Sequence, residues 1–279
     1  MQGFAMDLKG SVNYIKMKNK LYKEFASYYA DVTNDRDFKG QLELILDTFD
    51  SDNPCRSFLE LFAGQSLHSV EALKKPDIDV WAIDSSSEMK QIALAEGFKN
   101  PAQYIVEDLP EAILKCPDHI KFDCITCLYN GLSILNMENV FQLLKNCRQK
   151  LSDHGKMFVE MHDIFLITEY LSNPQIRQTE VTNSRGELIK YTWPSGKIKW
   201  NPYNYRAEVP VQFLIHSSHR VDTIEFTSYD HIYSTEHIIF LAGLIGFEAR
   251  IITENPSWTE FFGNSIILEL SVKQETPNS

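Results

Sequence analysis

The 279-residue sequence predicts an α/β fold, built on a mostly parallel sheet that helices cover on both faces. The first observation is the alternation, between residues 56 and 172, of short apolar runs with segments of helical length. Buried parallel strands and their crossover helices produce this pattern. The second is that an acidic residue stands in or directly after three successive apolar runs, where the carboxyl ends of parallel strands meet.

The N-terminal part is expected to form a helical cover over residues 11–49, which ends at a polar break over 50–54. Strand–helix repeats follow the break. The expected strands, each with its helix, are 56–61 with 66–75, 79–83 with 86–96, 103–106 with 109–115, 122–128 with 137–151, and 156–161 with 164–172.

The pattern changes after residue 175. Short β-like runs at 178–182, 188–193, 209–215 and 223–229 are separated by turn sequences, which predicts an antiparallel insertion. A helix over 235–244 and strands at 248–253 and 265–272 then complete the main sheet as an antiparallel pair. We therefore expect one domain made of 1–175 and 231–279, with 176–230 as an inserted lid over the site or a dimer face.

Composition excludes several classes of protein. A net charge of −11 disfavours a nucleic-acid partner. The chain has no apolar run of about 18 residues and no signal-peptide core at its start, so we expect a cytoplasmic protein without a membrane partner. Its five cysteines show no framework spacing, and Cys124 and Cys127 have no second pair, so free thiols and no metal site are expected.

The three acids are Glu60, Asp84 and Asp108, and they follow one another at equal intervals. Asp84 lies about 20 residues beyond Gly64, where a carboxylate typically binds a ribose diol. Asp108, or Glu107 beside it, suits the exocyclic amine of adenine. Glu60 would repel a pyrophosphate and attract an ammonium group. This combination favours S-adenosyl-L-methionine (SAM), which joins an amino acid to adenosine without a phosphate.

Four segments in the expected order resemble the motifs of class I SAM-dependent methyltransferases, and together they cover about residues 55–165. The first motif is an apolar strand, an acid and a Gly-x-Gly-x-Gly turn, which FLELFAGQS resembles, with Glu60 as the acid and Gly64 as the middle glycine. Phe62 and Ser66 stand at the other two glycine positions. The second, third and fourth motifs correspond, in that order, to the segments VWAIDSSSEM, VEDL and FDCITCLYNGL.

This resemblance implies a Rossmann-like methyltransferase sheet that binds SAM and releases S-adenosyl-L-homocysteine. Met89 would pack near the adenine, Leu109 would lie at its edge, and Leu128 would face the methionine part. The cofactor-binding residues that the resemblance and the acids indicate are Tyr22, Tyr29, Glu60, Ala63, Gly64, Asp84, Ser85, Met89, Glu107, Asp108, Leu109 and Leu128.

The N-terminal segment YKEFASYYADVTNDRDF resembles the leading helices of small-molecule methyltransferases, including sugar N-methyltransferases. In that subgroup tyrosines help to close the site, which makes Tyr22 and Tyr29 candidates. Packing in a hydrophobic core is the alternative role for both. A β insertion after the fifth strand is also typical of the subgroup, and it implies a small-molecule acceptor and a lid.

His162 and Tyr129 are the candidate catalytic residues. His162 follows the fifth strand, where an imidazole could take a proton from an acceptor hydroxyl or ammonium, and a packing role is the alternative. Tyr129 ends the fourth strand. We expect methyl transfer from SAM to nitrogen or oxygen by in-line displacement. A non-catalytic SAM-binding or interaction protein is the alternative, and an NAD-dependent dehydrogenase is disfavoured by Glu60.

Overall fold

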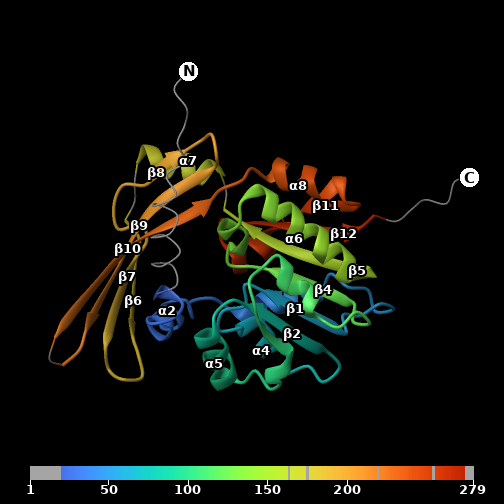
Figure 1. Cartoon of the computed structure of the whole chain (residues 1–279), viewed down its shortest axis with the longest axis horizontal. Helices are drawn as coiled ribbons and strands as arrows, with labels where there is room; N and C mark the ends of the chain where they lie inside the picture. The colour runs from blue at the N-terminus through green and yellow to red at the C-terminus, as the bar shows by residue number, and fades with distance from the viewer. Residues whose placement is uncertain (1–19, 163, 174–175, 219, 253–254, 274–279) are drawn as a thin grey trace, which may run out of the picture.

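The computed structural model describes residues 20–162, 164–173, 176–218, 220–252 and 255–273 (Figure 1). A seven-stranded central sheet has the order β11-β12-β5-β4-β1-β2-β3. Strands β1 to β5 are parallel, whereas β12 is antiparallel to both β5 and β11. The strands of the central sheet are β1 (Ser57–Leu61), β2 (Asp79–Asp84), β3 (Tyr104–Val106), β4 (Phe122–Cys127), β5 (Leu151–Met161), β11 (Phe247–Ile251) and β12 (Ile266–Val272).

The order of the strands predicts where on the sheet a ligand binds. The chain runs outward from β1 through β2 to β3, then returns to β4 on the other side of β1. At such a reversal the loops after the two central strands diverge, and ligands bind outside the carboxyl ends of the strands. The loops that follow β1 and β4 therefore frame the site.

Helices cover both faces of this sheet. Because neighbouring strand residues point to opposite faces, Leu59 packs in a core beneath α6 and α8, and Phe58 packs in a second core beneath α3, α4 and α9. The helices are α2 (Ala26–Val32), α3 (Phe38–Leu46), α4 (Leu67–Ala72), α5 (Ser87–Glu96), α6 (Met137–Lys150), α7 (Ile164–Ser172), α8 (Thr235–Leu244) and α9 (Pro256–Phe262), with short 3-10 helices η1 (Pro101–Gln103), η2 (Glu111–Lys115) and η3 (Gly131–Ile134).

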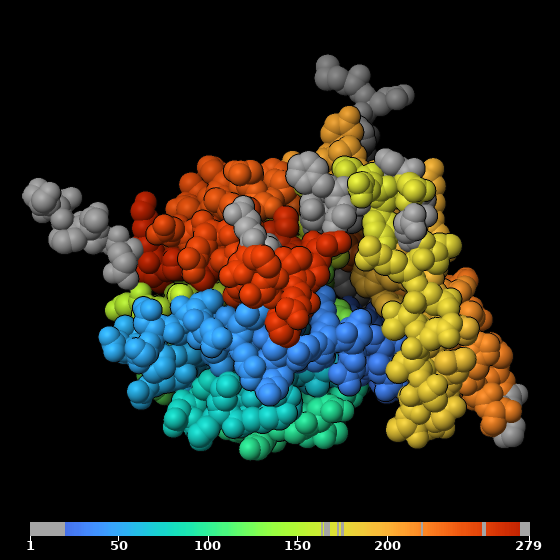
Figure 2. Space-filling view, turned by 180° about the vertical axis from the view of Figure 1, so that it is seen from behind, coloured from blue at the N-terminus to red at the C-terminus, as the bar shows by residue number. Residues whose placement is uncertain are grey.

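A second, antiparallel sheet stands beside the first, with the order β10-β9-β7-β6, and β8 pairs with β9. Helix α2 lies between the two sheets, and from behind the blue N-terminal residues border the yellow ones of the second sheet (Figures 1 and 2). Leu21 and Val32 share an apolar cluster with Ile189 and Phe213. The strands of this second sheet are β6 (Gln178–Thr182), β7 (Leu188–Thr192), β8 (Lys199–Asn201), β9 (Arg206–His216) and β10 (Val221–His231).

The predicted fold class is confirmed, and the differences are local. The expected helix at 109–115 is only the 3-10 helix η2, because Pro110 interrupts the start of that short segment. Strands β9 and β10 extend beyond the expected runs, and β8 and α9 were not predicted. Asn255 caps α9 and Pro256 begins it, a start signal that the sequence does carry. The part of the expected N-terminal cover before residue 20 lies outside the described residues.

Within the described ranges, no helix combines the length and the apolar character that crossing a membrane requires. The same residues contain no group of three or more histidine, cysteine or acidic side chains placed to hold a metal ion.

Candidate functional site

The turn after β1 keeps a glycine-type backbone although it has only one glycine. Phe62, Gly64 and Ser66 have φ values of 52°, 51° and 59°, in the left-handed region. These are the three positions where the resembled motif has glycine. For a bulky residue such as Phe62 this conformation costs on the order of 1–3 kcal/mol. The hydroxyl of Tyr104 donates to the carbonyl of Gly64 at 2.5 Å, which helps to hold the turn.

Phe62 also explains why a small residue follows β4. A Cβ atom added at Gly131 would lie 2.5 Å from Cδ2 and 2.9 Å from Cγ of the Phe62 ring. Gly131 begins η3 without a positive φ, so the space taken by the ring, and not the backbone, requires glycine there.

This packing gives a stability prediction. Gly131→Ala is expected to lower the free energy of unfolding by about 1–3 kcal/mol, because the methyl group overpacks the site. In a Phe62→Ala background the same change should cost little, as measured by denaturant unfolding. Gly196→Ala is the control, since its Cβ would make only an ordinary 3.5 Å contact with Pro210. Equal losses in both backgrounds would disprove the proposed contact.

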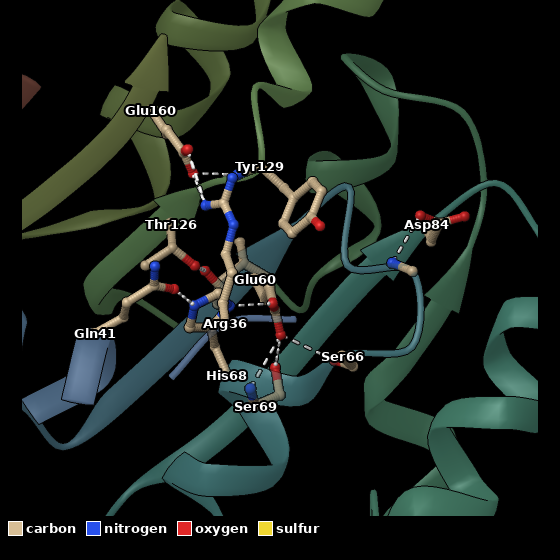
Figure 3. Close-up of polar contacts among 12 residues, drawn as sticks. Arg36, Gln41, Glu60, Ser66, His68, Ser69, Asp84, Thr126, Tyr129 and Glu160 are labelled. Carbon is tan, nitrogen blue, oxygen red and sulfur yellow. Dashed lines mark hydrogen bonds and ion pairs between the residues drawn. The ribbon is translucent and has the colours of Figure 1, made fainter. Parts of the chain in front are cut away.

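Glu60 ties the turn to the start of α4 and is only 5% exposed (Figure 3). Its Oε2 accepts hydrogen bonds from the Ser66 hydroxyl at 3.0 Å, from the Ser69 amide at 3.0 Å and from the Ser69 hydroxyl at 2.5 Å. Its Oε1 lies 3.1 Å from Nδ1 of His68. The acid therefore shapes the loop in addition to facing the cavity.

His68 links Glu60 to helix α3. Gln41 of α3 donates through Nε2 to the carbonyl of Phe261, so its Oε1 faces Nε2 of His68 at 2.8 Å and accepts from that ring nitrogen. The other ring nitrogen, Nδ1, lies against the carboxylate of Glu60. The imidazole is therefore fixed between the acid and α3. No local sequence pattern points to His68 or Gln41.

Asp84 ends β2 and faces the same turn. Its Oδ2 accepts from the amide of Gly64 at 2.9 Å, and its Oδ1 accepts from the amide of Ser86 at 2.9 Å. Burial raises the pKa of Asp84, and these two hydrogen bonds oppose the shift. The Ser86 hydroxyl also donates to the carbonyl of Tyr22, at 2.5 Å, which attaches the N-terminal segment to the end of β2.

A second buried acid, Glu160 near the end of β5, joins three segments (Figure 3). Both its oxygens lie 2.8 Å from Nη1 of Arg36, and they also accept from the Tyr129 amide at 2.6 Å and the Ser265 hydroxyl at 2.8 Å. Burial lowers the pKa of Arg36, but Glu160 outweighs this effect and the pKa lies above its usual value. No local sequence pattern points to Arg36 or Glu160.

Of the two candidate catalytic residues, Tyr129 is held by this cluster. The guanidinium of Arg36 stacks 4.0 Å above its ring, and its hydroxyl donates to Oδ1 of Asp35 at 2.9 Å. Burial raises the pKa of Tyr129, so the phenol stays protonated near neutral pH. For His162, burial lowers the pKa and Asp230 opposes the shift. The imidazole is therefore neutral at pH 7 and able to accept a proton.

One cavity of about 670 Å³, a size within the usual range for small-molecule sites, is lined by Arg36, Glu60, His68, Asp84, Tyr129 and His162. Every residue predicted for the site lines it. Tyr22 and Tyr29 meet edge to face at 5.1 Å and also pack against the apolar cluster beside the second sheet, so both roles considered for them fit their position. Lining residues that the sequence analysis did not predict include Arg36, His68, Tyr191, Trp193, Val209 and Asp230.

Comparison with known families identifies the central region. Residues 58–155 match the family described as "Methyltransferase domain". The match covers about a third of the chain, the part that contains β1 to β4. The predicted resemblance to methyltransferases is thereby confirmed. No curated protein matches the sequence.

Solved structures share the fold of this chain. DesVI from Streptomyces venezuelae superposes with a TM-score of 0.69 at 13% identity, over 89% of this chain and 96% of its own. The sugar N-methyltransferase KedS8 from a Streptoalloteichus species gives 0.68 at 14%, over 90% and 93%. A SAM-dependent methyltransferase from Clostridium acetobutylicum gives 0.67 at 17%, over 90% and 98%. At these identities the likeness concerns the fold alone, over about nine tenths of this chain.

Proposed function

We propose that the chain transfers a methyl group from SAM to a nitrogen or oxygen of a small-molecule acceptor. The observation that supports this proposal is one cavity that joins the carboxyl ends of β1, β2 and β3 to the second sheet. A cofactor held at the strand ends would thus present its reactive group toward a separate, enclosed acceptor region.

The residues at the strand ends fit SAM. A carboxylate has about four acceptor positions, so Asp84 can accept from a ribose diol while it holds Gly64. A Cβ at Gly64 would meet nothing within 4 Å, so the backbone of the turn is open to close approach by a ligand. Met89 and Leu109 would contact the adenine, with Asp108 or Glu107 at its amine. The Glu60–His68 pair and Leu128 would lie near the amino-acid part.

When bound, SAM supplies an electrophilic methyl group for in-line displacement by the acceptor. The chain then has to align the acceptor and keep water out. Tyr191, Trp193 and Val209 form aromatic and apolar walls on the acceptor side, beside the buried carboxylate of Asp230. Such walls with a carboxylate favour an acceptor that carries an amine. The likeness in fold to KedS8 makes amino sugars the first amines to test.

The proposal is tested by incubating the protein with SAM and a panel of amines and hydroxylated metabolites that includes amino sugars. Release of S-adenosyl-L-homocysteine, together with an acceptor that gains the mass of one methyl group, is the expected result. SAM binding without turnover on any member of the panel would favour the alternative, a SAM-binding protein without catalysis.

His162 is expected to act as the general base for the acceptor found in that panel. His162→Gln should lower kcat by about 100- to 10,000-fold and leave the affinity for SAM unchanged. The wild-type rate should fall only below the ordinary histidine pKa of about 6.5, because the pKa of His162 is lowered and protonation abolishes its function as a base. His154→Gln is the control, since His154 pairs with Asp123 away from the cavity lining. An unchanged kcat in His162→Gln would exclude the role.

A further inference from the structure

We infer that the chain forms a twofold-symmetric dimer through β11, the edge strand at the end of the central sheet opposite β3 (Figure 1). β11 pairs with β12 on one side, and no residue that the structure describes pairs with its other side. An open strand edge carries unpaired N–H and C=O groups, which the strand of another chain can satisfy. In the dimer this edge is covered by β11 of a second copy.

The outward backbone groups of β11 belong to alternate residues, as in any antiparallel pair. Ile252 donates to the carbonyl of Ile267 across the pair, so every second residue before Ile252 also bonds β12. The N–H and C=O groups of Phe247, Ala249 and Ile251 therefore point away from β12. Ala249 is the middle of the three. A twofold axis at Ala249 pairs all of them, with Phe247 opposite Ile251 of the second copy.

Charge selects this register among those that use the middle of the strand. Glu248 and Arg250 flank Ala249, are exposed and point to the same face of the sheet. With the axis at Ala249, Glu248 of each copy lies opposite Arg250 of the other. An axis at Glu248 or at Arg250 would instead place like charges directly opposite each other, which destabilises paired strands. The edge is thus complementary to itself with the axis at Ala249.

Both charged side chains have bonding groups left for this contact. Arg250 donates from Nε and Nη2 to Glu269 of β12, which leaves its Nη1 group for the second copy. The side chain of Glu248 makes no hydrogen bond or ion pair with any residue that the structure describes. An ion pair between the two copies would therefore add to the bonds within each copy and break none of them.

Helix α8, which precedes β11, supplies apolar surface for the same interface. Residues 238–247 contain no charged side chain. A helix that is apolar on all sides is normally buried, but Phe240 and Leu244 of α8 are 65% and 61% exposed, and Ile251 of β11 is 39% exposed. An exposed apolar patch of this kind marks an interaction surface.

The symmetry of the paired edge brings these apolar surfaces together. Phe247 and Ala249 share a core with Ile238 and Ala242 of α8, so this helix covers the face of the sheet to which they point. An axis at Ala249 runs through the joined sheet, and the two copies of α8 then lie on the same face, one on each side of the axis. Each copy contributes the same patch to the other, as a twofold interface requires.

Sedimentation velocity on the full chain tests this dimer. The wild type should sediment at micromolar concentration as a dimer of two 32.2 kDa chains. Glu248→Arg should raise the dissociation constant by at least about 10-fold, because it turns two attractive cross-strand pairs into repulsive ones. Glu225→Arg is the matched control, since Glu225 lies in the middle of β10, the edge strand of the second sheet, and it should leave the dimer intact.

Two further variants test the backbone pairing and the apolar patch. Ala249→Pro removes the central outward N–H, which takes no part in the ladder to β12, so the chain should fold and sediment as a monomer. Circular dichroism in the far ultraviolet checks that it folds. Leu244→Glu places a charge in the exposed patch without touching either strand, so it carries the same expectation if Ala249→Pro unfolds.

A wild type that stays monomeric, or a dimer that survives both Glu248→Arg and Leu244→Glu, would overturn the inference. Loss of the dimer in Glu225→Arg alone would overturn it too, and would assign the interface to the second sheet. No residue of α8 or β11 lines the cavity. Glu248→Arg should therefore bind SAM as the wild type does, which keeps this test separate from that of the proposed function.

Discussion

Asp84→Ala is expected to lower the affinity for SAM by at least about 100-fold, measured by isothermal titration calorimetry. The carboxylate is assigned two roles, and the substitution removes both. It accepts from the Gly64 and Ser86 amides, which shapes the turn after β1, and it would accept from the ribose diol. Hydrogen bonds to a charged group contribute roughly 1.5–3 kcal/mol each, so losing two of them from the ligand alone accounts for a loss of this size.

The matched control is Asp79→Ala, at the opposite end of the same strand. Asp79 accepts from Trp81 and Gln103 and does not line the cavity. The Asp79→Ala substitution should therefore leave the affinity for SAM unchanged. Wild-type affinity in Asp84→Ala would remove Asp84 from the ribose site.

Glu160→Ala is expected to lower the free energy of unfolding by about 3–5 kcal/mol, measured by denaturant unfolding. Removing one partner of a buried ion pair leaves the other charge without compensation. Arg36 would lose its carboxylate, and the Tyr129 amide and Ser265 hydroxyl would lose their acceptor. The loss thus combines an ion pair with two hydrogen bonds.

Glu71→Ala is the comparison for an exposed pair. Glu71 accepts a hydrogen bond from Lys74, but the Lys74 side chain is 64% exposed and regains water when the pair is broken. We expect a loss of at most about half that of Glu160→Ala. Equal losses would contradict the account of Glu160 as the acid that holds a buried cation.

Local pattern is enough to predict the acids of the site. Glu60, Asp84 and Asp108 end or follow apolar runs, and parallel strands bring their carboxyl ends to one edge of a sheet whatever the details of packing. The same argument correctly places His162 and Tyr129 at the cavity, because each follows the end of a strand.

The contacts between distant segments could not be predicted in this way. Arg36 and Glu160 are separated by 124 positions, and no local period relates them. The pairing of Glu60 with His68 depends on how α3 places Gln41. At Phe62, a residue that argues against a glycine turn nevertheless adopts its backbone, because the surrounding packing overrides the local preference.

The central claim is that the strand ends hold SAM and not a dinucleotide. Titration of the wild-type protein with SAM, S-adenosyl-L-homocysteine and NAD in the same calorimeter tests it most directly. We predict saturable binding of SAM and S-adenosyl-L-homocysteine and no binding of NAD. Binding of NAD without binding of SAM would contradict the account.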